Sequence, residues 1–250
     1  MSKTRHRTEP LVRGYAVTHP PGRAALADQA GWDHLIYTAT GTLTVHAGDH
    51  VWTVPPHRAL WLPDGAAAET RNHYRAAVRT LYFAAHLRAA PATATVVTLS
   101  GFPRELLLYV VRVCPLTDTD DSQRALLTVL LDQLRDLPAA RLALPVPHDP
   151  ATRRAAEILR TDPDAELGEI ARGIGMSRRT LERRFAAETG IALGAWRRRA
   201  RLLGALEPLA AGVPVARVGV ESGYSTASAF VTAFTTEFGE SPRNFLRGKA

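Results

Sequence analysis

A cluster of charged side chains directly after a serine has the composition of a DNA-reading surface. It follows Ser177 and consists of Arg178, Arg179, Glu182 and Arg183. An arginine guanidinium can donate two hydrogen bonds to guanine, and a glutamate can accept one from cytosine, although an arginine can equally bind a phosphate. On an isolated helix such a charge run is more simply a solvated face, so its meaning depends on the sequence around it.

The pattern around this cluster occurs twice. The copies are 48 residues apart up to a serine and 49 residues apart after it, so the second contains one inserted residue. The first copy consists of Ile170, Ala171, Gly175, Met176, Ser177, Leu181, Phe185 and Gly190, and the second of Val218, Gly219, Gly223, Tyr224, Ser225, Phe230, Phe234 and Gly239. Two structural units of one kind are therefore expected.

Each feature of the repeat has a physical role in a helix-turn-helix unit. The small second residue lets two helices approach closely, and the glycine four residues later permits a tight turn. The serine two residues further on, Ser177 or Ser225, is predicted to be the N-cap of the second helix. The two large apolar residues at i and i+4 bury the inner face of that helix, and the last glycine ends it. The charged cluster then lies on an exposed recognition helix.

The second recognition helix is expected to contribute less to DNA affinity. Its outer face is predicted to show Thr226, Ala227, Ser228, Val231 and Thr232, with no arginine, which favours phosphate, water and thymine-methyl contacts. Between the units, 192–211 is predicted to form one helix of about 30 Å, close to the ~34 Å between successive major grooves on one DNA face. This helix carries Arg197, a predicted phosphate contact. The predicted DNA-contact residues are Ser177, Arg178, Arg179, Glu182, Arg183, Arg197, Ser225, Thr226, Ser228 and Thr232.

Charge and composition agree with the hypothesis that the C-terminal part binds DNA. The 250 residues carry a net charge of +7, of which 151–250 contribute +5 (16 basic minus 11 acidic). A basic C-terminal part favours a nucleic-acid partner. With one cysteine, Cys114, and no apolar run after its basic N-terminus, we expect a cytoplasmic location; no segment approaches the roughly 18 apolar residues of a membrane span.

The N-terminal part of the chain has a different residue pattern, which is typical of strands. Short β-prone segments separated by turn residues predict a β-barrel or sandwich: 35–40, 42–46, 51–54, 59–62 and 78–83. Helices are predicted at 103–113 and 121–137, the second with a stripe of six leucines that packs on its own domain or forms a dimer seam. The proline-rich 138–150 is predicted to be a linker.

Residues 151–250 resemble the DNA-binding domain of the AraC/XylS family. The resemblance rests on motifs along the whole segment: 167–171, 175–185, the helix around Trp196, 223–234, Phe238-Gly239, Ser241-Pro242 and Phe245. It implies base-reading positions at Arg179, Glu182 and Arg183 in the first unit, and at Ala227, Ser228, Val231 and Thr232 in the second. The apolar Ala227 and Val231 depart from strong hydrogen-bonded readout.

The N-terminal part is similar to the cupin-like sensing and dimerisation domain of that family, through 32–44, 54–63 and 79–83. The resemblance implies an α+β protein with two domains: a cupin-like β-barrel with flanking helices at 1–137, a linker at 138–150, and an all-α domain with two helix-turn-helix units at 151–250. It also implies a small-molecule effector, a homodimer and RNA polymerase as partners of a DNA-bound regulator.

The sensing domain offers candidate effector contacts. Trp32, His34, Tyr37, Trp61 and Tyr82 could line a small-molecule pocket, although aromatic residues at strand spacing are more often part of a core. The histidines expected of a metal-binding cupin are missing at the matching positions, so neither a metal nor another cofactor is predicted; His34 and His73 could still converge.

Two other functions remain as alternatives. One is a constitutive, architectural DNA-binding protein without effector, which should bind with little sequence preference. The other is a cupin-type metalloenzyme such as an oxygenase or isomerase, which would need a His/Glu metal set that the sequence does not supply. The preferred interpretation is a DNA-binding transcription regulator that is not an enzyme.

Overall fold

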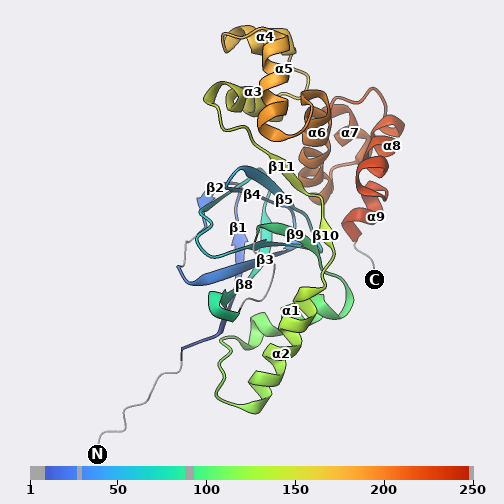
Figure 1. The fold of residues 1–250 in the computed structure, drawn as a ribbon. Coiled ribbons are helices and arrows are strands. Elements are labelled where there is room, and N and C mark those ends of the chain that lie inside the picture. Colours follow the sequence, from blue (N-terminus) through green and yellow to red (C-terminus); the bar gives the residue numbers. More distant parts are fainter. Residues whose placement is uncertain (1–8, 27–29, 88–92, 248–250) are drawn as a thin grey trace, which may run out of the picture.

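The computed structural model describes residues 9–26, 30–87 and 93–247. Figure 1 shows a β-rich part in the middle, two helices on one side of it, and a group of helices on the other. The strands are β1 (Val12–His19), β2 (Gly22–Ala25), β3 (Trp32–Thr40), β4 (Leu43–Ala47), β5 (His50–Val54), β6 (Arg58–Leu62), β7 (Ala68–Asn72), β8 (Ala76–Ala84), β9 (Thr95–Thr98), β10 (Ala139–Ala140) and β11 (Ala143–Pro145). A short 3₁₀ helix follows β8 at Ala85–Leu87.

The helices divide into two groups. The first group is α1 (Gly101–Val113) and α2 (Asp121–Arg135). The second is α3 (Pro150–Thr161), α4 (Leu167–Gly173), α5 (Arg178–Thr189), α6 (Leu193–Ala210), α7 (Val215–Glu221), α8 (Ala227–Phe238) and α9 (Pro242–Arg247). Among the described residues no helix is both long enough and apolar enough to cross a membrane. The expected α+β chain with a helical C-terminal part is confirmed.

The strands form two antiparallel sheets that face each other as a sandwich. The six-stranded sheet has the order β1-β8-β3-β6-β9-β10, and the five-stranded sheet has the order β11-β5-β4-β7-β2. In the described part of the chain no strand ladder joins the two sheets, so the expected β-barrel is not closed. The five predicted strand segments appear as β3, β4, β5, β6 and β8, and their order along the chain is as expected.

The central strands of the six-stranded sheet are buried on both faces, whereas much of the edge strand β1 is exposed. Successive residues of β3 point to opposite sides, so Ile36 packs in the sandwich interior, whereas Leu35 and Tyr37 pack toward α1 and α2. Three of the six leucines of 121–137 are buried in this second cluster (Leu127, Leu130 and Leu134), and the other three pack against it (Leu126, Leu131 and Leu137). The leucine stripe therefore packs on its own domain, which is the simpler of the two predicted roles.

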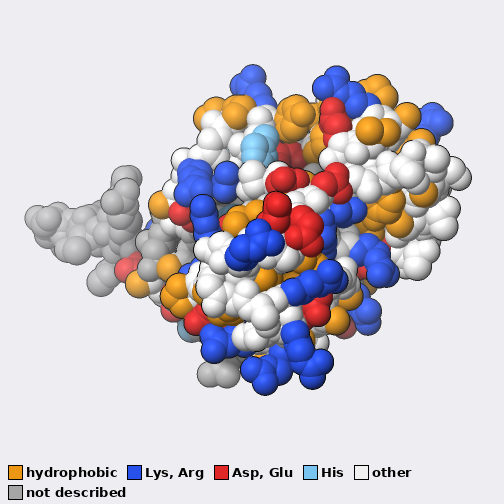
Figure 2. Space-filling model, turned by 90° about the horizontal axis from the view of Figure 1, so that it is seen from above, with side chains coloured by type: hydrophobic (Ala, Val, Ile, Leu, Met, Phe, Trp, Pro, Cys, Tyr) orange, Lys and Arg blue, Asp and Glu red, His pale blue; other side chains and the backbone are white. Residues whose placement is uncertain are grey.

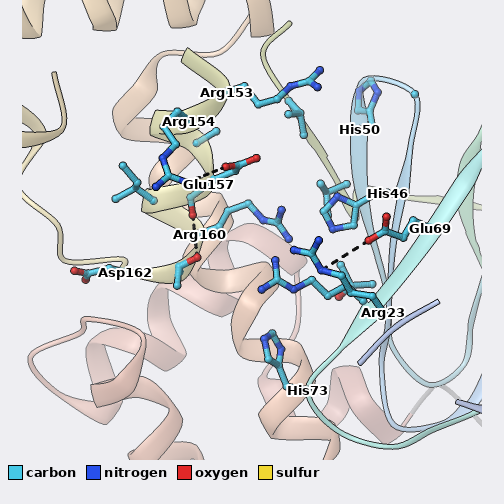
Figure 3. Close-up of a pocket in the computed structure, with 18 residues that line it drawn as sticks. Arg23, His46, His50, Glu69, His73, Arg153, Arg154, Glu157, Arg160 and Asp162 are labelled. Carbon is cyan, nitrogen blue, oxygen red and sulfur yellow. Dashed lines mark hydrogen bonds and ion pairs between the residues drawn. The ribbon is translucent and has the colours of Figure 1, made fainter. Parts of the chain in front are cut away.

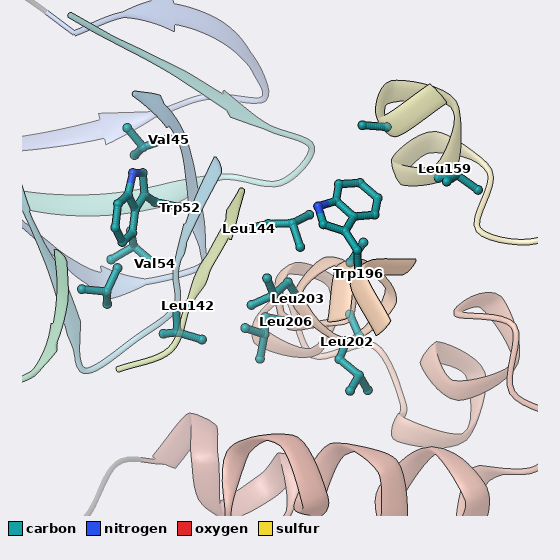
Figure 4. Packing of buried hydrophobic residues seen from close by; sticks show 14 of the residues in the cluster. Val45, Trp52, Val54, Leu142, Leu144, Leu159, Trp196, Leu202, Leu203 and Leu206 are labelled. Carbon is teal, nitrogen blue, oxygen red and sulfur yellow. The ribbon is translucent and has the colours of Figure 1, made fainter. Parts of the chain in front are cut away.

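The segment 138–150, predicted as a linker, contributes a strand to each sheet. β10 pairs with β9 and β11 pairs with β5, and both Leu142 and Leu144 are buried. Figure 4 shows these two leucines between Trp52 of the sheet and Leu203 and Leu206 of α6. One apolar cluster therefore continues from the sandwich interior into the helical part.

Polar contacts also join the two parts of the chain. The carboxylate of Glu207 on α6 accepts hydrogen bonds from the backbone N–H groups of His73 and Tyr74, the latter at 2.9 Å, and its second oxygen lies 2.9 Å from the His73 ring. Glu207 is buried, while the His73 side chain is exposed. A second contact places Arg58 of β6 against Glu240 at 3.8 Å and over the ring of Phe245.

We expect Glu207→Ala to lower the free energy of unfolding by about 1–3 kcal/mol, because the backbone N–H groups of His73 and Tyr74 lose their buried acceptor. His73→Ala is the matched control, since it keeps both backbone donors and removes only an exposed ring, and it should cost less than about 0.5 kcal/mol. Chemical denaturation of the two variants measures both values. Equal losses for both would mean that the ring, rather than the backbone contact, stabilises this junction.

Candidate DNA-binding interface

The first helix-turn-helix unit consists of α4, a turn and α5. Gly175 in the turn has a φ of +72°, and Gly190 after α5 has a φ of +70°, both in the left-handed region that favours glycine. Ser177 caps α5, because its Oγ accepts a hydrogen bond from the Thr180 N–H at 3.1 Å. Leu181 and Phe185 are fully buried. The predicted roles of these residues are confirmed.

The second unit consists of α7, a turn and α8, with Phe230 and Phe234 fully buried. A side-chain carbon added to Gly219 would lie 3.0 Å from the Cβ of Phe230, which explains why a glycine is needed where the two helices cross. Gly223 has a φ of +80° and Gly239 a φ of +79°. The turn and the end of this unit therefore match the first.

The N-cap of α8 is Thr226 and not Ser225, which corrects the sequence prediction. The Thr226 Oγ1 accepts a hydrogen bond from the Ala229 N–H at 3.1 Å. Thr226 follows Ser177 by 49 residues, the same offset as the buried pairs and terminal glycines, so the inserted residue lies in the turn. Ser225 is an exposed turn residue.

We expect Thr226→Ala to destabilise the chain by about 1 kcal/mol through loss of the cap. Ser225→Ala should change the free energy of unfolding by less than about 0.5 kcal/mol, because this hydroxyl caps no helix. Thermal or denaturant unfolding of the two variants distinguishes them. A larger loss for the serine variant would restore the original assignment.

The outward face of α5 presents two free arginines and one pair. Arg178 forms an i,i+4 ion pair with Glu182, with Nε and Oε1 2.9 Å apart, and this hydrogen bond raises the pKa of the Arg178 guanidinium. Arg179 and Arg183 are exposed, and neither has a hydrogen bond or ion pair within the described residues. These two guanidiniums are available to a ligand in front of the helix.

The outward face of α8 is smaller and uncharged. Ser228 and Thr232 are exposed on it, at the positions that correspond to Arg179 and Arg183. Val231 was expected on this face but is half-buried and packs against the core. The exposed outer face of α8 is therefore narrower than expected.

The arginines of α6 fix the two units relative to each other. Arg197 donates to the carbonyls of Pro163 at 2.8 Å and Ala165 at 2.9 Å in the loop before α4. Arg201 donates to Pro163 O and Asp164 Oδ1 in the same loop, and to the Gly223 carbonyl in the turn of the second unit at 3.2 Å. The first unit's loop and the second unit's turn are thus joined through one side chain.

Arg198 is the residue of this helix that the sequence interpretation missed. It is exposed, and within the described chain its guanidinium makes no hydrogen bond or ion pair. It lines a groove together with residues of the second unit, including Ser225, Thr226, Ser228 and Thr232. Its position directly after Arg197 offered no signal to choose between the two.

On the face seen from above, basic side chains do not form one continuous patch. Figure 2 shows groups of Arg and Lys side chains separated by acidic ones on the face seen from above. Bulk charge alone therefore gives little reason for a fixed orientation of a bound DNA. The position of individual side chains on α5 and α8 must supply it.

The predicted effector residues lie in the sheet and its margins. Tyr37 and Trp61 are buried in the cluster below α1 and α2, and His34 is buried with its ring 4.5 Å from that of Tyr82. Trp32 lies under the guanidinium of Arg13. None of these five residues lines the cavity of about 1020 Å³ that the sandwich forms with α3. Within the described ranges no group of three or more His, Cys, Asp or Glu side chains could hold a metal ion.

Comparison with known proteins agrees with this geometry. A family model described as a helix-turn-helix domain matches residues 170–248. The chain is 30% identical over 214 residues to the HTH-type transcriptional regulator NimR of Escherichia coli, a match that covers 85% of this chain and 78% of NimR. It is 32% identical over 111 residues to the HTH-type transcriptional regulator RipA of Corynebacterium glutamicum, covering 42% of this chain and 34% of RipA.

Among solved structures, ToxT from Vibrio cholerae aligns over 94% of this chain and 98% of its own, at 10% identity and a TM-score of 0.39. The two capped units, which share one buried apolar cluster, define a helix-turn-helix DNA-binding protein. With the match to NimR over most of both chains, the chain belongs to the AraC/XylS family of HTH-type transcriptional regulators.

Proposed function

We propose that this regulator reads one DNA site with two unequal units, the first specifying bases and the second mainly positioning the protein. The observation that carries the proposal is the contrast between corresponding positions, Arg179 and Arg183 on α5 against Ser228 and Thr232 on α8. Arginines can bond bidentately to guanine, whereas hydroxyls bond to bases or phosphates with little discrimination. Ser177, Arg178, Glu182, Ser225 and Thr226 complete the proposed contact surface.

Among the arginines of α6, we propose Arg198 as a phosphate contact. Its guanidinium is unpaired beside the α8 face, while the guanidinium of Arg197 already satisfies two carbonyls. The predicted phosphate contact of Arg197 stays a prediction, and the bonds of Arg197 give it a structural role whether or not it touches DNA. Arg201 has such a role by the same argument.

The regulatory part of the proposal is that the β-sandwich senses a small effector and that the protein is a cytoplasmic regulator rather than an enzyme. For this chain, effector control is supported by a cavity of small-molecule size that the sandwich lines together with α3. A sensing domain at 1–137 and a DNA-binding domain at 151–250, joined by 138–150, is the proposed division. A homodimer and a contact with RNA polymerase are further expectations.

Selection of bound DNA from a random pool by the full chain, at near-physiological salt, tests this proposal. A motif of two blocks about one helical turn apart, with the sharper base preference in one block, is the expected result. An equally sharp base preference in both blocks would contradict the proposal that the first unit specifies bases and the second mainly positions the protein. Binding without an enriched motif, which only weakens as salt rises, would favour the architectural alternative.

A further inference from the structure

One cavity lies between the β-sandwich and the DNA-binding helices. Its volume is about 1020 Å³, at the upper end of small-molecule sites. One wall is the outer face of the five-stranded sheet, from β2, β4 and β7, and the other is α3 (Figure 3). Because the walls belong to different halves of the chain, an occupant would touch both.

The lining of this cavity is basic. It contains five arginines and three acidic residues, together with His46, His50 and His73. Two of the carboxylates are already paired, Glu69 with Arg23 at 3.9 Å and Glu157 with Arg154 at 3.5 Å. The third, on Asp162, accepts a hydrogen bond from a backbone N–H of its own loop.

Two arginines in the cavity have no such partner. The guanidinium groups of Arg71 on β7 and Arg160 on α3 make no hydrogen bond or ion pair within the described part of the chain. Burial and the nearby positive charge of Arg71 lower the pKa of the Arg160 guanidinium. The two like charges on opposite walls thus repel each other, and the carboxylate of Glu157 offsets their effect on Arg160 only in part. Such an arrangement costs free energy unless something compensates it.

The imidazole of His46 is another polar group in this cavity without a hydrogen-bond partner. Its Nε2 is buried without a hydrogen-bond partner, and burial together with Arg160 lowers the pKa of its ring to about 4. Figure 3 shows His46 and Arg160 on facing walls of the cavity. A neutral imidazole can donate a hydrogen bond to an oxygen placed between the walls.

We propose that this cavity binds a small organic oxyanion, with carboxylate or phosphate groups held between Arg71 and Arg160. Charge-assisted hydrogen bonds from two guanidiniums would satisfy both, and His46 would complete the site. The inference deepens the proposed effector control and depends on it only for the consequence for DNA binding. An anion that bridges the walls favours the arrangement in which the sheet and α3 are close, and so couples the two halves.

Titration of the full chain with citrate and with inorganic phosphate, at constant ionic strength set by sodium chloride, tests the site by calorimetry and thermal melting. We expect saturable binding and a higher Tm with at least one of them, and no effect of neutral glycerol. Arg71→Gln and Arg160→Gln should each raise the dissociation constant at least about tenfold. Arg75→Gln, an exposed arginine outside the cavity, is the matched control and should bind as the unaltered chain does.

Thermal melting in buffer without citrate or phosphate gives an independent check of the oxyanion proposal. Because the two arginines repel each other, either glutamine variant should melt at the same or a higher temperature than the unaltered chain. A marked fall in Tm for both, or no saturable binding of either anion, overturns the proposal. If Arg160→Gln does not fold, Arg71→Gln carries the test alone.

DNA binding in buffer without citrate or phosphate distinguishes the oxyanion proposal from the proposal on DNA reading. Arg71→Gln and Arg160→Gln should bind the selected DNA site with unchanged affinity, since no oxyanion occupies the cavity under these conditions. Weaker binding with a smaller salt dependence would make the cavity a DNA-phosphate site and overturn the oxyanion proposal. Failure to select any motif would instead count against sequence-specific reading and leave the anion titration valid.

Discussion

Replacing Trp196 with alanine should lower the free energy of unfolding by about 3–5 kcal/mol. Its side chain is fully buried, its ring lies 5.1 Å from that of Phe185, and its Nε1 donates to the Pro145 carbonyl at 2.7 Å. The substitution therefore opens a cavity in the first helix-turn-helix unit and also removes the bond to β11. Since whole domains are stabilised by about 5–15 kcal/mol, much of the total would be lost.

Trp196→Phe provides the control, because it keeps an aromatic ring in the core and removes only the indole donor. Its expected cost is about 1–3 kcal/mol. Denaturant unfolding followed by far-ultraviolet circular dichroism gives both values, and hydrogen exchange should show faster opening of β11 in both variants. A loss below about 1 kcal/mol for the alanine variant would mean that this tryptophan does not support the domain junction.

The second large effect concerns DNA. Arg183→Ala should weaken binding to the selected site by about 1–3 kcal/mol and relax the preference at one base position. Thr232→Ala, at the corresponding position of α8, should cost less and leave the preferred sequence unchanged. Competition binding against single-base variants of the site measures both the affinity and the preference.

Arg198→Ala serves as the comparison for a phosphate contact. It should weaken all sequences alike and reduce the slope of log affinity against log salt by about 1. If Arg183→Ala also weakened every sequence equally, Arg183 would be a phosphate contact, and the assignment of base reading to α5 would have to be abandoned.

The helix-turn-helix units were largely predictable because their signals are local. Turn glycines, buried i,i+4 pairs and capping side chains act within one or two helical turns, so spacing alone locates them. Ser225 was misassigned because both Ser and Thr are good caps and the one-residue insertion lies in the turn between Gly223 and Thr226. Only the hydrogen bond from Ala229 decides in favour of Thr226.

Strands at the margins of the sandwich were not predictable in the same way. β2 and β7 read GRAA and AETRN, without the alternation of apolar and polar residues that marks a half-buried strand. They form because neighbouring strands offer backbone partners. Likewise, the roles of Arg197 and Arg201 depend on carbonyls more than twenty residues away, and the cavity between β7 and α3 depends on how the two halves dock.

The strand β11 belongs to two structures at once, and this has a consequence for how the DNA-binding part could be inherited or transplanted. Its backbone completes the five-stranded sheet, yet its carbonyl at Pro145 holds Trp196, and the carbonyl of Arg141 just before it accepts from Arg199. Further along, Glu188 accepts from the N–H groups of His148 and Asp149. A transplantable module would therefore begin near Arg141 rather than after Pro150, and a new sensor joined to it would have to supply an edge strand for β11.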